Sequence, residues 1–231
     1  MNSLINTSRP SGGAQRGAPY PDRQGTFVMK IAIIGATGNV GSRILSEALR
    51  RGHAVTAIAR DPSTLEARPG LTAVEADANI PGTLAPHLSG HDAVVSALKF
   101  SSSQPDLLID AVRRSGVKRY LVVGGAGSLE TAPGTLLIDS PHFPKAYFEE
   151  ASAGKAFLDR LRGLSDLDWT MLSPSALFVA GERTGAFRLG EDTLLTAADG
   201  KSWISYEDFA MALLDEIETQ RHPRQRFTIG Y

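Results

Sequence analysis

Short apolar runs alternate with longer amphipathic stretches along most of the chain. Between residues 30 and 123, runs rich in Val, Ile and Ala recur at 30–34, 55–59, 71–75, 92–97 and 120–123. The stretches between them, such as 40–49 and 106–115, carry apolar residues at helical spacing. Short continuous apolar runs are typical of strands buried on both faces, and strands that alternate with helices form βαβ units. We therefore predict an α/β protein with a doubly wound parallel sheet, the Rossmann fold.

The alternation is looser after Val123. Residues 124–143 are rich in Gly and Pro and are expected to form a long loop, which in a compact domain usually carries function. Strand-like pieces at 186–189 and 193–196 predict a small C-terminal embellishment on the substrate side, at about 175–205. The other predicted elements are a helix, a strand, a closing helix and a final strand, at 144–162, 168–172, 206–218 and 226–229.

The first 28 residues differ in composition from the rest of the chain. They are rich in Pro and Gly and have almost no periodic apolar residues, which predicts a disordered N-terminal tail over 1–28 and a domain over 29–231. Met29 directly precedes the first strand and could be the natural start, so a mis-annotated leader is an alternative to a functional tail. Because this segment has no apolar region typical of a secretion signal, a cytoplasmic location is expected.

Charge and composition exclude several classes of protein. The chain has 24 Lys and Arg against 25 Asp and Glu, so it lacks the excess of cations that a dedicated nucleic-acid binder needs. It contains no Cys, which excludes disulfides and thiolate metal sites. Its apolar runs are shorter than the roughly 20 residues that span a bilayer, so no membrane segment is expected. We predict no metal site, because Gly90 interrupts the helix that His87 and His91 would need to share.

The most informative motif is the segment 35–41, Gly-Ala-Thr-Gly-Asn-Val-Gly, between the first strand and the first helix. Gly35 permits the tight turn, Gly38 lets a diphosphate approach the backbone, and Gly41 allows the helix to pack closely on the strand. The helix N-terminus then offers free N–H groups to phosphate. A glycine-rich turn without a ligand is the alternative. The residues of this motif that we assign to cofactor binding are Gly35, Thr37, Gly38, Asn39 and Val40.

The glycine spacing and three later segments carry a family resemblance. These segments are 167–174 (LDWTMLSP), 181–185 (GERTG) and 203–210 (WISYEDFA). Over nearly all of 29–231, the chain resembles the atypical branch of the short-chain dehydrogenase/reductase superfamily. It is most similar to NAD(P)H-binding, NmrA-like proteins, including those described as NADH-flavin reductases and as flavin reductases of the biliverdin reductase B type. The resemblance implies a Rossmann fold, a nicotinamide cofactor and flavin reduction.

The end of the second predicted strand bears on the choice of dinucleotide. An NAD-preferring site places a carboxylate there to accept from the ribose hydroxyls. Here the strand runs into Arg60, whose guanidinium can pair with a 2′-phosphate, so we favour NADP over NAD. The alternative is that Asp61 takes the ribose of NAD and Arg60 is a solvated cation.

Further cofactor contacts are expected where the parallel strands end, since ligands of such sheets bind outside their carboxyl ends. Asp77 and Ala78 should flank the adenine, although Asp77 could instead cap a helix. The residues expected around the ribose and the nicotinamide are Ser96, Ala97, Leu98, Gly124, Gly125, Ser173 and Pro174, with Leu177 and Phe178 as a further cover.

Carbonyl chemistry in this superfamily uses a Tyr-x-x-x-Lys pair and a Ser near the end of the fifth strand, and this chain departs from that pattern. Four residues after Tyr147 stands Ala151, and the next lysine, Lys155, is eight positions on. Ser128 lies several residues beyond the strand end. The candidate catalytic residues are Ser128, Tyr147 and Lys145, with His142 nearby; each could instead be a solvated or capping residue.

A flavin or quinone accepts hydride without such a pair, because its proton can come from water and the protein need only hold the two rings together. We therefore predict an NAD(P)H-dependent oxidoreductase that reduces a flavin, quinone or similar conjugated acceptor, with flavin as a substrate rather than a tightly bound group. Two alternatives are a non-catalytic NADP sensor of the NmrA type and an NADP-dependent reductase or isomerase of a small metabolite. The sequence leaves the oligomeric state open.

Overall fold

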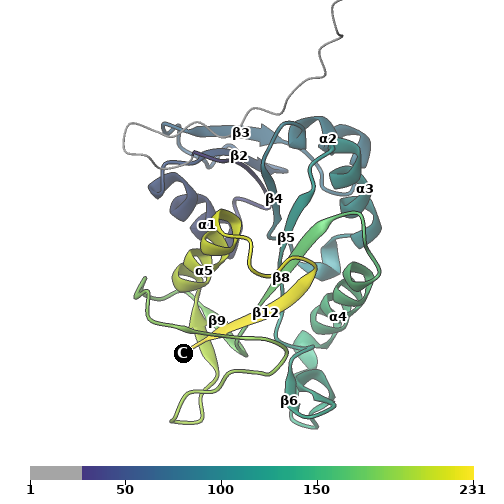
Figure 1. Cartoon of the computed structure of the whole chain (residues 1–231), viewed down its shortest axis with the longest axis vertical. Coiled ribbons are helices and arrows are strands. Elements are labelled where there is room, and N and C mark those ends of the chain that lie inside the picture. The colour runs from purple at the N-terminus through teal and green to yellow at the C-terminus, as the bar shows by residue number, and fades with distance from the viewer. Residues whose placement is uncertain (1–27) are drawn as a thin grey trace, which may run out of the picture.

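A computed structural model describes residues 28–231, which fold around one large sheet (Figure 1). The sheet has eight strands in the order β10-β12-β8-β5-β4-β1-β2-β3, all parallel except β10, which is antiparallel to its neighbour β12. The strands are β1 (Lys30–Ile34), β2 (Ala54–Ala59), β3 (Leu71–Glu75), β4 (Ala93–Ser96), β5 (Arg119–Val123), β8 (Asp168–Pro174), β10 (Arg188–Gly190) and β12 (Gln225–Gly230). The predicted fold class is confirmed. The predicted disordered tail, 1–28, lies outside the described residues except for its last residue.

Helices cover both faces of the sheet and bury one core on each. The helices are α1 (Asn39–Arg50), α2 (Pro81–Leu88), α3 (Pro105–Ser115), α4 (Phe148–Arg162) and α5 (Tyr206–Glu218). Figure 1 shows α1 and α5 together on one face, with α2, α3 and α4 on the other. Side chains alternate between the two cores along β1, where Ile31 and Ile33 pack beneath α1 and α5 while Ala32 and Ile34 pack beneath α2 and α3. None of the helices formed by residues 28–231 is long and apolar enough to cross a membrane.

Short elements at the carboxyl end of the sheet differ from the sequence prediction. The expected loop 124–143 contains a small hairpin, and the substrate-side region contributes a second two-stranded sheet. The strands of these sheets are β6 (Glu130–Ala132) with β7 (Thr135–Leu136), and β9 (Leu177–Val179) with β11 (Trp203–Ser205). The remaining elements are 3₁₀ turns: η1 (Phe100–Ser102), η2 (Leu137–Asp139) and η3 (Lys145–Tyr147).

One predicted strand is absent, and one predicted helix begins later than expected. No strand forms over 193–196; Thr193 makes a single bridge to Glu130, and the Leu195 carbonyl accepts from the hydroxyl of Ser202 instead of from a strand. The helix predicted from residue 144 begins at Phe148, because the preceding residues form the 3₁₀ turn η3. Tyr147 is therefore the N-cap residue of α4 and not a residue of its interior.

Candidate functional site

The glycine loop packs tightly between the ends of β2 and β4. Gly35 has a φ of +84°, and a Cβ there would lie 2.6 Å from the Ala97 carbonyl oxygen. Its N–H donates to the Ile58 carbonyl at the end of β2. A Cβ on Gly41 would lie 2.1 Å from the Gly35 oxygen, so α1 approaches the loop more closely than any side chain permits. Both positions require glycine, as the motif predicts.

The N-terminus of α1 lacks the capping side chain and the first-turn carboxylate that usually stabilise a helix N-terminus. Its N-cap is Gly38, which makes no side-chain hydrogen bond, and the first turn carries no acidic residue. The N–H groups of a first helical turn have no partner within the helix, so they are available to an anion. A Cβ on Gly38 would crowd the Gly35 carbonyl at 3.3 Å. The loop is thus suited to the diphosphate of a dinucleotide.

Two carboxylates near the predicted adenosine end are held in local turns. Asp61 accepts from the Ser63 N–H at 3.0 Å, and its contacts with Ser63 hold the pKa of the Asp61 carboxyl below its ordinary value. Asp77 accepts from the Asn79 N–H at 2.8 Å, which makes a turn just before α2. Arg60 is exposed beside Asp61 at the end of β2. The end of β2 therefore carries an exposed guanidinium, while the carboxylate that follows it accepts a hydrogen bond from Ser63.

A cavity of about 470 Å³ opens beyond the ends of β5 and β8. Of the residues that the sequence predicts for the site, those on its wall are Gly124, Gly125, Ser128, His142, Tyr147, Pro174 and Phe178. Lys145 is exposed in η3 and is not on the wall. Ser173 is fully buried behind Gly124, with its Oγ 2.9 Å from where a Gly124 Cβ would stand. Seven of the expected substrate-side residues thus meet in one cavity. The others do not line it: Ser96, Ala97, Leu98, Lys145, Ser173 and Leu177.

One face of α4 and its N-cap forms a wall of this cavity. Tyr147, Glu150, Ala151, Gly154 and Lys155 line it, with the spacing that places residues on one side of a helix. Ala151 stands where the superfamily pattern has its lysine. The backbone of Gly127, in the stretch after β5, packs directly on it, since a Cβ on Gly127 would lie 2.7 Å from the Ala151 Cβ. Gly127 therefore allows the loop after β5 to lie directly against α4.

Glu150 is a site residue that the sequence analysis missed. Its two carboxylate oxygens accept from the N–H groups of Phe100, at 2.7 Å, and Ser101, at 2.9 Å. This holds the Phe100 ring against α4, where a Cβ on Gly154 would be 2.8 Å from it, and edge-on to Phe157 at 5.7 Å. Glu150 is 50 residues away from Phe100 in the sequence, and no local pattern links them.

Ser128 is held from outside the cavity by a buried arginine. The Arg226 guanidinium donates to the Ser128 hydroxyl at 3.3 Å and to its carbonyl at 3.4 Å. The same guanidinium forms an ion pair with Asp192, in the segment after β10. Ser128 is thereby fixed in the wall, and its hydroxyl already accepts one hydrogen bond.

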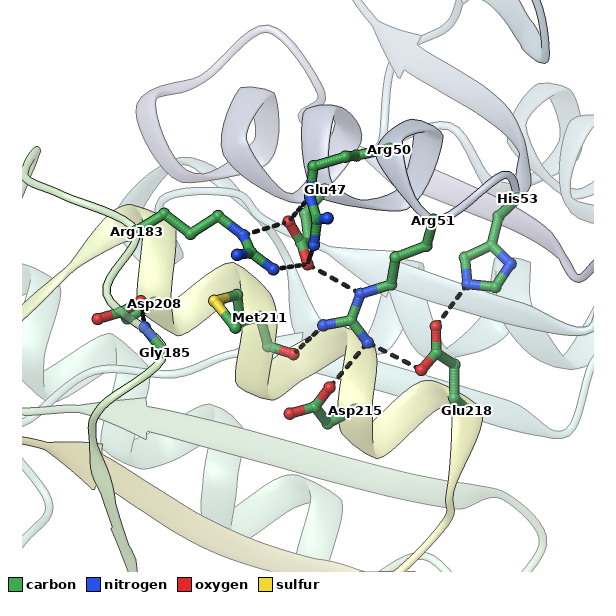
Figure 2. A network of polar contacts seen from close by, with 10 residues as sticks. All are labelled: Glu47, Arg50, Arg51, His53, Arg183, Gly185, Asp208, Met211, Asp215 and Glu218. Atoms are coloured by element: carbon green, nitrogen blue, oxygen red, sulfur yellow. Dashed lines mark hydrogen bonds and ion pairs between the residues drawn. The ribbon is translucent and has the colours of Figure 1, made fainter. Parts of the chain in front are cut away.

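The opposite wall belongs to the segment that follows β8. Phe178 lies on the cavity and packs between Tyr206 and Phe209, with ring centroids 4.7 and 4.8 Å apart. The 181–185 segment then docks on α5, as Figure 2 shows in part. Asp208, which is fully buried, accepts from the Gly185 N–H at 2.9 Å and from a threonine hydroxyl of the same segment at 2.5 Å. This wall is anchored by polar contacts away from the cavity.

A second anchor joins the same segment to α1 (Figure 2). Glu47 is buried and accepts from the guanidinium groups of Arg50, Arg51 and Arg183, the last at 3.0 Å. Burial alone raises the pKa of the Glu47 carboxyl, but these hydrogen bonds outweigh it and hold the pKa well below 4.5. Arg51 also pairs with Asp215 and Glu218, so the network ties α1, α5 and the 181–185 segment together.

His87 and His91, which the sequence analysis rejects as a metal-binding pair, have separate surroundings in the structure. The His91 ring is hydrogen-bonded to the Leu88 carbonyl and to the Thr56 hydroxyl, while His87 lies at the end of α2. Within residues 28–231, no group of three His, Asp or Glu side chains is placed to hold a metal ion.

Comparison with known proteins places this geometry among nucleotide-binding proteins. A family model described as NAD(P)H-binding matches residues 35–220. The uncharacterised protein YwnB of Bacillus subtilis is 42% identical over 211 residues, which cover 87% of this chain and 98% of YwnB. A Bacteroides thetaiotaomicron structure, named a "putative epimerase", shares 41% identity at a TM-score of 0.84 over 88% of this chain and 97% of that one. A Streptococcus pneumoniae structure, named a "putative NADH-flavin reductase", shares 36% identity at a TM-score of 0.77 over 87% and 99%.

Proposed function

Because the chain belongs to the NAD(P)H-binding family, we propose that it is an oxidoreductase that passes hydride from NADPH to a flavin, quinone or similar conjugated acceptor. The observation that carries this proposal is the cavity beyond β5 and β8. It lies where the nicotinamide end of a dinucleotide on the glycine loop would reach, since ligands of doubly wound sheets extend along the carboxyl ends of the strands.

The chain supplies a cradle for each part of the cofactor. The uncapped first turn of α1 would bind the diphosphate, and Gly125, which has no side chain to fill the cavity, would leave space for the nicotinamide ring. When bound, the reduced nicotinamide supplies the hydride. The walls hold the second ring against it and keep out water, which is catalysis by proximity.

The form of the α4 wall favours conjugated acceptors over simple carbonyls. A carbonyl needs an acid to protonate the developing alkoxide. Here Tyr147 caps α4, 65% exposed, and Ala151 stands four residues after it. The next lysine on this wall, Lys155, is one turn further on and is paired with Asp159. A flavin or quinone spreads the incoming charge over its ring, and its proton can come from solvent. The S. pneumoniae relative named for NADH-flavin reduction is consistent with this choice.

Arg60 supports NADPH as the preferred donor. It is an exposed cation at the end of β2, the position that in NAD-preferring folds carries a carboxylate for the ribose. The neighbouring carboxylate, Asp61, is engaged with Ser63. A 2′-phosphate would therefore meet a cation at this position.

The test follows NADPH oxidation with and without a panel of flavins, quinones and small carbonyl compounds. We expect turnover with flavins or quinones and little with simple carbonyls. Ala126→Trp would place a bulky side chain in the cavity and should abolish turnover while NADPH affinity stays within a few fold. Ala132→Trp, on the exposed β6 hairpin, is the matched control and should leave activity unchanged.

Other outcomes would replace this proposal. Tight NADP binding without turnover on any acceptor would favour a sensor that responds to the cofactor. Turnover confined to carbonyl compounds would favour a reductase of a small metabolite.

A further inference from the structure

A second cavity, of about 390 Å³, lies where the C-terminal end of α4 meets the start of β12 and the segment that follows β10. It shares no wall residue with the cavity beyond β5 and β8. All but one of the residues on its wall are charged or carry an amide, and three are arginines, so we call it the arginine pocket. Its wall is formed by Arg162, Trp169, Glu191, Asp192, Arg224, Gln225 and Arg226.

The two carboxylates of the arginine pocket do not balance its three guanidinium groups. Three positive charges against two negative ones leave the wall with one net positive charge. Asp192 uses one oxygen, Oδ1, for its contacts, among them a hydrogen bond from the Arg226 Nε at 2.6 Å. Within residues 28–231, neither Arg224 nor Glu191 takes part in an ion pair. The pocket therefore offers donors to an anion from outside the chain.

Arg226 is the buried arginine of the set. Its side chain is 3% exposed, and burial lowers the pKa of its guanidinium even though Asp192 pairs with it. Its contacts with the Ser128 hydroxyl and carbonyl are long, at 3.3 and 3.4 Å. Removing a guanidinium from water has a cost that an incomplete set of partners does not offset. A further negative charge in the pocket would offset more of it.

The other two arginines are exposed and weakly engaged. The ion pairs of Arg162, with Asp159 and Asp192, are 3.4 and 3.6 Å long. Arg224 has a φ of +56°, and no other residue except glycine has a positive φ in the described part of the chain. Its N–H donates to the Trp169 carbonyl at 2.6 Å, which holds this turn at the wall of the pocket. Such a strained conformation has a free-energy cost and is often found at ligand sites.

We propose that the arginine pocket binds a small anion with two or more acidic groups, such as a diphosphate or a tricarboxylate. One acidic group would pair with Arg224 and Arg162 on the exposed side, and another would approach Arg226 on the buried side. The planar fork of a guanidinium suits carboxylate and phosphate oxygens alike. With a single acidic group, fewer guanidinium partners would offset the repulsion from Glu191 and Asp192.

Arg226 also connects the arginine pocket with the cavity beyond β5 and β8. Its guanidinium donates to Ser128, which lines that cavity. Asp192 pairs with Arg226 through its side chain, and its carbonyl accepts from the Glu130 N–H at 2.9 Å. Both contacts hold the segment 128–130 to the arginine pocket. An anion bound there should therefore make this segment of the cavity wall more rigid.

Calorimetric titration with diphosphate, citrate and inorganic phosphate tests the site. NADP⁺ is kept saturating, so that the glycine loop is filled and cannot take up the added anion. We expect one diphosphate or one citrate to bind per chain, at least about tenfold more tightly than inorganic phosphate, since a further charged hydrogen bond adds about that factor. The ratio of the diphosphate and citrate affinities then assigns the ligand to phosphates or to carboxylic acids.

Three variants locate the binding. Arg224→Gln should weaken binding of the preferred anion about tenfold or more. Glu191→Gln, which removes a repelling carboxylate, should tighten it about threefold, a gain that a damaged fold would not produce. Arg221→Gln is the matched control, because Arg221 is exposed in the same connection between α5 and β12 but is not on the wall. It should bind like the wild type.

Hydrogen exchange measured by mass spectrometry reads the effect on the cavity wall. With the preferred anion bound, the amides of 128–130 should exchange at least about threefold more slowly in the wild type and in Arg221→Gln. At the same anion concentration, Arg224→Gln should show little change. Exchange in the 35–41 loop should not respond in any of the three proteins.

The results that would overturn this inference are distinct. Absence of binding by both diphosphate and citrate would exclude the site. Equal weakening by Arg224→Gln and Arg221→Gln would show general attraction to a positive surface, and would also exclude it. Binding that leaves exchange at 128–130 unchanged would refute the link through Arg226. None of these measurements uses turnover, so a failure of the oxidoreductase function would appear separately, in NADPH oxidation.

Discussion

The N-termini of α1 and α5 are built in opposite ways, although the two helices pack side by side in one core (Figure 1). At α5, the Ser205 hydroxyl accepts from the Asp208 N–H at 3.0 Å, and Glu207 and Asp208 place negative charge in the first turn. At α1, the N-cap is Gly38, no side chain caps the helix, and no acidic residue follows.

This difference separates a structural helix end from one prepared for a ligand. Capping residues and first-turn carboxylates stabilise a helix N-terminus from within. α1 forgoes both, and its N–H groups are left for an external anion. The stabilising role therefore falls on α5, where the same carboxylate that starts the helix also anchors the 181–185 segment.

The largest effect on stability is expected from removing the Asp208 carboxylate in the first turn of α5. Asp208→Ala should lower the free energy of unfolding by about 3 kcal/mol, because three donors lose a charged acceptor that is itself fully buried. These donors belong to Thr184, Gly185 and Tyr231. Urea unfolding measures the loss. The control, Asp215→Ala on the exposed side of α5, should cost less than about 1 kcal/mol. A small loss for Asp208→Ala would show that the end of α5 is not an anchor.

The next largest effect should fall on the cofactor side alone. Arg60→Ala should weaken NADPH binding by about 1.5–3 kcal/mol, the scale of a charged hydrogen bond, and leave NADH binding nearly unchanged. Fluorescence titration of both cofactors, with unfolding measured in parallel, separates affinity from stability. Arg114→Ala, a substitution of an exposed arginine in the last turn of α3, serves as the control. Equal losses for NADPH and NADH would contradict pairing with the 2′-phosphate.

A moderate, pH-dependent loss of stability is expected from protonation of Glu47, which accepts hydrogen bonds from Arg51 and Arg183. The folded-state pKa of Glu47 is held below its ordinary value of 4.5, so the stability it contributes is complete above that pH and is lost as the pH falls below it. Between pH 6 and pH 3, the wild type should lose about 1–2 kcal/mol more than Glu47→Gln. Urea unfolding at several pH values measures this difference. Parallel pH profiles for the two proteins would contradict it.

The smallest effect comes from making α1 resemble α5. Asn39→Asp adds a carboxylate to the first turn, which should raise the free energy of unfolding by about 0.3–1 kcal/mol. The same charge should repel the cofactor diphosphate and weaken NADPH binding about fivefold to tenfold. Asn39→Ser, which adds no charge, should do neither. A carboxylate that leaves NADPH affinity intact would place the diphosphate elsewhere.

The main strands, the helices and the glycine loop were predictable because their signals are local. Strand β1 has five residues and packs into a core on each face, so its apolar run stands out, and the loop between β1 and α1 needs glycine at Gly35 and Gly41 for reasons of backbone space. The predicted family resemblance is confirmed as well. β6, β7, β9 and β11 were missed because elements of two or three residues are too short to show a periodic pattern.

Only part of the predicted site lines the cavity. Gly124, Gly125 and Tyr147 were placed at the cavity from strand and helix order, and they line it. Lys145, exposed in the 3₁₀ turn before α4, lies off the wall. Their roles in binding and catalysis stay predictions. Glu150 was missed because a carboxylate on a helix is common, and only its contact with η1 distinguishes it.

By itself, the sequence determined the strands and helices that build the sheet, the glycine loop and the absence of a Tyr-x-x-x-Lys pair, since periodicity, turn chemistry and spacing act over a few residues. Only the tertiary structure decided how the walls of the cavity beyond β5 and β8 are built and anchored. It brought Phe100 to Glu150 across 50 residues and Arg183 to Glu47 across 136. Contacts over such separations depend on how strands and helices pack, because the chain between the partners carries no signal of where they meet.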